Sequence, residues 1–94
     1  MASYAITHVN SNDVLHSSVE LFLLDGTDGS INVTLPIISA DGNTYYIKRI
    51  DTNVLATITL TAASGETINN AVTRTLNMNE GIRIVSYNHN YIIL

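Results

Sequence analysis

The stretch SINVTLP, residues 30–36, shows most directly how this chain folds. Ile31, Val33 and Leu35 alternate with polar residues, and side chains two positions apart lie on the same face of a strand. Pro36 has no N–H to donate to a β-ladder, so we expect the strand to end before it. The stretch therefore predicts a short strand with one buried and one polar face.

Similar segments recur along the chain, separated by residues that favour turns. Twelve Ile, seven Val and eleven Thr make up 30 of the 94 residues, and β-branched side chains favour strands over helices. Asp25–Gly29 and 41–43 have the composition of hairpin loops, and 88–90 that of a last hairpin turn. Only residues 10–18 carry cap residues suited to a single helical turn. We expect a stub at Thr67-Ile68 and strands at Ser3–Val9, Val19–Leu24, Ser30–Leu35, Thr44–Ile50, Thr57–Ala62, Thr73–Leu76, Gly81–Tyr87 and Tyr91–Leu94.

Length, composition and charge exclude several classes of protein. Residues 1–94 are expected to form one domain, and 46% apolar with 13% charged residues excludes a disordered acidic or basic tail. The net charge is −4 and no basic stripe is present, so we expect no nucleic-acid binding. The apolar runs are far shorter than the ~20 residues of a membrane helix, and the start lacks a signal-peptide pattern, so no membrane insertion is expected. The absence of cysteine excludes thiol catalysis and zinc–thiolate sites.

No residue pattern points to catalysis or to a cofactor. His8, His16 and His89 are far apart in sequence, so a metal or proton-transfer site would require the fold, or three copies on an axis, to bring them together. Asp25–Gly29 resembles part of a calcium loop, but Pro36 stands where an EF-hand loop needs its twelfth-position Glu. We therefore expect no enzyme, no metal site and no cofactor.

Several strands lack a polar face, which suggests a contact between subunits. Thr44–Ile50 and Gly81–Tyr87 carry apolar or aromatic residues on both faces, and Tyr91–Leu94 has no polar face. A monomeric antiparallel sandwich normally leaves one face of most strands polar. We expect the second faces to be covered by other subunits, and we place the contact in the C-terminal hairpin at Ile84, Tyr91 and Ile93.

An ordered series of short motifs resembles a known protein family. The motifs are VTLP at 33–36, Gly42 with YxIKRID around 45–51, ITL at 58–60, GETI at 65–68, the strand 73–76 and VS at 85–86. In this order they resemble the C-terminal head or tip modules of trimeric phage and viral fibre proteins, which are also found on collagen-like fibres. The likeness covers about three quarters of the chain. It departs at 87–91, where many members have Asp-Gly and then Trp.

The resemblance implies a fold, an assembly and a role. Together with the strand pattern it predicts an all-β, small antiparallel β-sandwich of the jelly-roll kind, with about eight short strands, associating as a homotrimer. It implies a structural trimerisation and tip module in a virion fibre or tail, with the fibre shaft upstream and a host receptor or surface glycan as its contact. Two alternatives stay open: a capsid-decorating cement protein, and a carbohydrate-binding receptor-recognition module that would use exposed tyrosines among Tyr4, Tyr46, Tyr87 and Tyr91.

Overall fold

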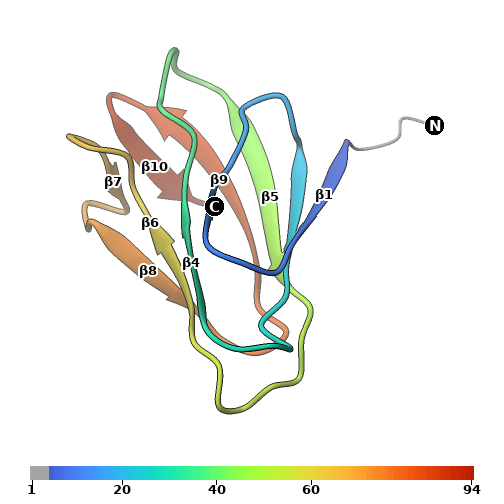
Figure 1. The fold of residues 1–94 in the computed structure, drawn as a ribbon. Helices are drawn as coiled ribbons and strands as arrows, with labels where there is room; N and C mark the ends of the chain where they lie inside the picture. Colours follow the sequence, from blue (N-terminus) through green and yellow to red (C-terminus); the bar gives the residue numbers. More distant parts are fainter. Residues whose placement is uncertain (1–4) are drawn as a thin grey trace.

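A computed structural model describes residues 5–94 of the chain, which form two packed β-sheets (Figure 1). No helix forms in this part of the chain, which confirms the all-β prediction and shows that residues 10–18 contain no helical turn. The structure is flat, with dimensions of 35 × 34 × 21 Å. Its strands are β1 (Ile6–Val9), β2 (Asp13–Val14), β3 (Leu21–Leu24), β4 (Ile31–Thr34), β5 (Thr44–Arg49), β6 (Ile58–Thr61), β7 (Thr67–Ile68), β8 (Thr73–Leu76), β9 (Gly81–Tyr87) and β10 (Asn90–Ile93).

The first two thirds of the chain wind like a solenoid. The six-stranded sheet has the order β1-β3-β5-β9-β10-β7, and the four-stranded sheet has the order β2-β4-β6-β8. Strands β1, β3 and β5 are parallel neighbours in the first sheet, and β2, β4 and β6 are parallel neighbours in the second. The chain therefore crosses from one sheet to the other after each strand. In the final third, β8 is antiparallel to β6, and β9 of the β9–β10 hairpin is antiparallel to β5, while the short β7 pairs in parallel with β10.

This topology corrects the prediction of an antiparallel jelly-roll sandwich. Both sheets are mixed, and Asp25–Gly29 is a corner between sheets rather than a hairpin loop, since it joins β3 in one sheet to β4 in the other. The same holds for 41–43, which precede β5. The turn between β9 and β10 is a hairpin, as predicted. The physical reason is that turn residues specify a change of direction, not the sheet to which the next strand returns.

The core lies between the two sheets and follows the alternation seen in the sequence. In β4, Ile31 and Val33 are buried, and so is Leu35 just after the strand. Phe22, Tyr45 and Tyr91 form an aromatic row across the six-stranded sheet, with ring centroids 6.1 and 6.0 Å apart. The rest of the core comes from both sheets: Val9, Leu15, Leu24, Ile38, Ile47, Ile58, Leu60, Ala62, Ile68, Leu76, Ile82 and Ile84.

Candidate functional site: the outer face of the six-stranded sheet

The outer face of the six-stranded sheet carries apolar side chains from several of its strands. In β3, Phe22 and Leu24 point into the core, so Leu21 and Leu23 point outward and stay partly exposed. The same alternation turns Val85 outward on β9. We define the outer face by six apolar side chains that are exposed or half-exposed and come from β1, β3, β9, β10 and the residue that follows it: Ile6, Leu21, Leu23, Val85, Ile92 and Leu94.

Strand pairing places these side chains in rows across the sheet. Ile6 pairs with Leu21, Leu21 with Tyr46, and Tyr46 with Arg83. The guanidinium carbon of Arg83 lies 5.8 Å from the centre of the Tyr46 ring, a cation–π distance. Leu94 continues the row, since its N–H donates to the carbonyl oxygen of Arg83.

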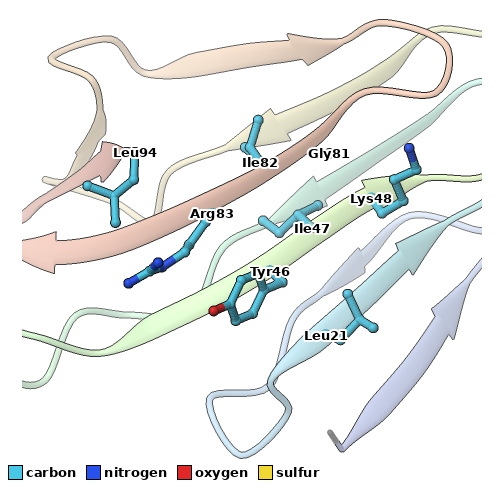
Figure 2. Close-up of a pocket in the computed structure, with 8 residues that line it drawn as sticks. All are labelled: Leu21, Tyr46, Ile47, Lys48, Gly81, Ile82, Arg83 and Leu94. Carbon is cyan, nitrogen blue, oxygen red and sulfur yellow. The ribbon is translucent and has the colours of Figure 1, made fainter.

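A shallow hollow of about 390 Å³ lies in this row (Figure 2). Leu21, Tyr46, Lys48, Arg83 and Leu94 are among the residues that line it. Figure 2 shows them on neighbouring strands of the sheet, with the Arg83 side chain near the Tyr46 ring. The arrangement offers apolar contact area together with the positive charges of Lys48 and Arg83.

The outer face of the four-stranded sheet has the opposite character. Its outward residues on β4, β6 and β8 are hydroxyl or amide side chains, and Val14 at the β2 edge is its exposed apolar residue. Val54 and Leu55 are also highly exposed, but they form a pair at a loop tip and not a face. The polar residues of this second face are Asn32, Thr34, Thr59, Thr61, Thr73 and Thr75.

The residues predicted for the subunit contact lie on the other side of the sheet. Ile84 and Tyr91 are 0% and 1% exposed and belong to the core of a single chain, and Ile93 is partly buried against that core. Their side chains are therefore occupied within one chain. A subunit contact made by this hairpin would have to use the side chains on the other face of the sheet, which include Val85 and Ile92.

Tyr91 instead helps to hold the loop that follows β4. Its hydroxyl donates to the carbonyl oxygen of Pro36 at 2.7 Å, and burial raises the pKa of this hydroxyl. The buried carboxylate of Glu66 accepts the N–H of Ile38 nearby, at 3.0 Å. Ser86, at the end of β9, donates its hydroxyl to the carbonyl oxygen of Ala40 at 2.7 Å. Buried polar groups from distant parts of the sequence thus fix this loop.

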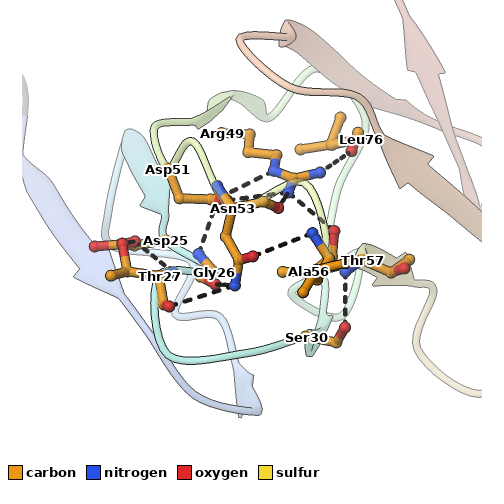
Figure 3. Close-up of polar contacts among 11 residues, drawn as sticks. Asp25, Gly26, Thr27, Ser30, Arg49, Asp51, Asn53, Ala56, Thr57 and Leu76 are labelled. Carbon is orange, nitrogen blue, oxygen red and sulfur yellow. Dashed lines mark hydrogen bonds and ion pairs between the residues drawn. The ribbon is translucent and has the colours of Figure 1, made fainter.

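A buried ion pair holds the opposite end of the molecule together (Figure 3). Arg49 is 5% exposed, and its guanidinium group donates two hydrogen bonds to the Asp51 carboxylate, each of 3.0 Å. It also donates to the carbonyl oxygens of Leu76, Asn53 and Ala56. We call this set, with the contacts of Asp51, the Arg49–Asp51 brace.

Asp51 completes the brace and leaves no group free for chemistry. Its carboxylate also accepts the backbone N–H groups of Gly26 at 2.9 Å and Asn53 at 3.1 Å. The hydrogen bonds from Arg49 chiefly hold the pKa of Asp51 at about 2, against the opposing effect of burial. Within residues 5–94, no buried side-chain nitrogen or oxygen lacks a hydrogen-bond partner. The brace is therefore a structural element.

Of the histidines, His8 is paired with a carboxylate, that of Asp25. Nε2 of His8 lies 2.8 Å from Oδ2 of Asp25, and Thr27 donates to the other oxygen of Asp25 through its N–H and its hydroxyl. These contacts, those of Thr27 first, lower the pKa of Asp25. Residues 5–94 contain no cluster of three or more side chains that could hold a metal ion.

The tyrosines expected for sugar stacking divide between the core and the outer face. Tyr91 is in the core, whereas Tyr46, beside Arg83, and Tyr87, 60% exposed at the end of β9, both point outward from the six-stranded sheet. Tyr4 lies outside the described residues. Two of the four tyrosines named from the sequence thus share the outer face.

Comparison with known proteins adds no family to these observations. No protein-family model matches the chain, and no curated protein matches it. Among residues 5–94, no helix has the length and hydropathy needed to cross a membrane.

Proposed function

We propose that the chain is a structural trimerisation and tip module of a virion fibre or tail protein, and that three copies associate through the outer face of the six-stranded sheet. The observation that carries this proposal is the six-residue apolar outer face. Apolar side chains from four strands on one face of a sheet favour burial against another chain. The outer face of the four-stranded sheet is rich in hydroxyl groups, so we expect the six-stranded sheet, and not the four-stranded one, to face the other copies.

The area that a stable interface needs is a modest share of the surface of one chain. A stable interface takes about 800 Å² from each partner, and one chain exposes 5399 Å² in all. Arg83 and Tyr46 add residue types that are enriched in the centres of interfaces.

The motif resemblance supports the trimeric state and the place at a fibre tip. Most of the residues that carry the resemblance build the fold: Tyr45, Ile47, Ile58 and Leu60 are in the core, and Arg49 with Asp51 forms the brace. A shared pattern of core and brace residues supports a shared structural role rather than a shared reaction. The proposal therefore assigns the module to assembly and attachment and not to catalysis.

Charge on the outer face should separate the copies, whereas charge on the other sheet should not. We expect Leu21→Asp to reduce the mass in solution from three chains to one, because the carboxylate would lose its water in the contact. Thr59→Asp is the matched control, since it places the same side chain outward on β6. Light scattering at micromolar concentration measures both, with far-ultraviolet circular dichroism as the test of folding. Dissociation by Thr59→Asp, with Leu21→Asp still assembled, would contradict the proposed face.

A further inference from the structure

A second hollow lies at the end of the molecule where the β9–β10 turn meets the loop after β4. Its volume is about 320 Å³, near the lower end of the ~300–1,000 Å³ of ligand sites. It lies apart from the residues of the outer face, and it is lined by Ile38, Ser39, Ala40, Asp41, Asn88 and His89.

The walls of this hollow are fixed by hydrogen bonds between segments far apart in the sequence. Oδ1 of Asp41 accepts the N–H of Asn88 at 3.0 Å, which joins the loop to the turn. Ser86 holds the carbonyl oxygen of Ala40, and its own carbonyl oxygen accepts the N–H of Gly42 at 2.7 Å. A site held in this way loses little conformational entropy when a ligand binds.

The turn between β9 and β10 has a histidine, His89, at a position that favours glycine. Asn88 and His89 have φ values of 51° and 60°, so both central residues of this two-residue hairpin turn are left-handed. Glycine is the favoured residue at the second position of such a turn, and Asn-Gly is the common pair. Histidine at position 89 is tolerated at a cost in backbone strain, and strained backbone positions cluster at functional sites.

The polar groups around the hollow are available to a ligand. Oδ2 of Asp41 and the side chains of Ser39, Asn88 and His89 make no hydrogen bond within residues 5–94, and all four residues are exposed. Together they offer a carboxylate acceptor, an amide and a hydroxyl that both donate and accept, and an imidazole ring. Ala40 and the edge of Ile38 supply apolar contact.

From this geometry we infer that the hollow binds a single neutral sugar ring. Sugar hydroxyls donate and accept hydrogen bonds at once, which matches the mixed set around the hollow, and the C–H groups of the ring suit the apolar part. Asp41 is the one charged residue of the lining, so an anionic ligand would be repelled. A metal ion would need a cluster of ligands that residues 5–94 do not form. The inference goes beyond the proposed assembly and does not depend on it.

Sugar titrations followed by amide chemical shifts test this site on the full chain. The probes are methyl α-D-galactopyranoside, methyl α-D-mannopyranoside, N-acetylglucosamine and, as the anionic comparison, N-acetylneuraminic acid. We expect saturable shifts at 38–41 and 88–89 with at least one neutral probe, at millimolar dissociation constants, as is usual for so small a ligand. We expect none with N-acetylneuraminic acid.

Two variants remove the proposed contacts while keeping the turn. His89→Gly leaves a residue that prefers the left-handed backbone, so its melting temperature should be unchanged or higher while binding weakens about tenfold or more. Asp41→Asn keeps an oxygen for the N–H of Asn88 but loses the charge, and we expect a similar loss of affinity. Asn79→Gly is the matched control, because Asn79 has a φ of 62° in another turn, and its affinity should equal that of the original chain.

Three results would overturn the inference. The first is the absence of saturable shifts with every neutral probe, and the second is binding of the anionic probe alone. The third is an affinity for a neutral probe that stays the same in His89→Gly and Asp41→Asn. Each can occur whether the chain is trimeric or not, so failure here is distinguishable from failure of the proposed assembly.

Discussion

Replacing Arg49 with alanine is expected to lower the free energy of unfolding by about 3–5 kcal/mol, the usual cost of breaking a buried ion pair on one side. The side chain of Asp51 is fully buried, and in the variant it would keep its charge without its main partner. The carbonyl oxygens of Leu76, Asn53 and Ala56 would also lose their donor. The variant would therefore lose the hydrogen bonds by which Arg49 joins β5 to β8 and to the loop between β5 and β6.

Urea unfolding measures this loss, and a double-mutant cycle shows its cause. Removing both partners with Arg49→Ala/Asp51→Ala should cost less than the sum of the two single variants, because no unpaired buried charge remains. Arg49→Lys should not restore stability, since an ammonium group cannot make the two parallel hydrogen bonds of a guanidinium group. A loss below about 0.5 kcal/mol for Arg49→Ala, the range of ordinary surface substitutions, would contradict the role of the brace.

The brace also predicts how stability depends on acid. The pKa of Asp51 is about 2 in the folded chain and 3.8 without these contacts. The folded value is the lower one, so the contribution is fully present above pH 3.8 and is lost as the pH falls toward 2. In Arg49→Ala the main cause of the low pKa is gone. We expect unfolding curves across this pH range to show a smaller dependence on acid than those of the original chain.

The same substitution at two neighbouring residues of β9 should have two different results. Ile84 is 0% exposed in the core, so Ile84→Asp is expected to cost about 5 kcal/mol or more, and to give unfolded or insoluble protein. A chain of 94 residues has a total stability of only about 5–14 kcal/mol. Val85 points outward, so Val85→Asp should keep the fold and separate the copies.

Circular dichroism, thermal unfolding and light scattering on this pair distinguish the core from the contact face. Val85→Thr serves as the milder second variant, which should weaken assembly without affecting the fold. The account would be contradicted if Ile84→Asp gave a folded monomer while Val85→Asp stayed assembled, because the contact would then use the side of the sheet assigned here to the core.

The sequence predicted the strands well because local alternation carries most of that information. Strand β4 and the hairpin of β9 and β10 lie close to their expected bounds. Alternation along β5 places Tyr45, Ile47 and Arg49 on one face, which is the buried one. The N-terminal strand begins at Ile6, and the expected start at Ser3 lies outside the described residues.

What the sequence did not predict depends on contacts between distant segments. Nothing in 25–29 shows that the next strand enters the other sheet, so the parallel winding was missed. Strand β2 was missed because Asp13–Val14 is too short to show alternation. The base Arg49 and the acid Asp51 were visible in the sequence, but not that the Asp51 carboxylate accepts hydrogen bonds from both Arg49 and the N–H of Gly26.

The contact face was hard to predict for a different reason. On β9 and β10 both parities carry large apolar residues, such as Ile84 and Val85, so alternation alone does not say which parity faces the core. The deciding fact is that β9 lies between β5 and β10, with the aromatic row on its inner side. Ile84 and Tyr91 therefore point into the core, and Val85 and Ile92 point outward.

The mass of the unmodified chain in solution shows whether three copies associate. Light scattering at micromolar concentration should give the mass of three chains of 10.2 kDa each. Because the outer face is apolar, this mass should persist at high salt, which screens ionic contacts but not apolar ones. A mass of one chain, 10.2 kDa, under the same conditions would contradict both the trimer and the fibre-tip role that rests on it.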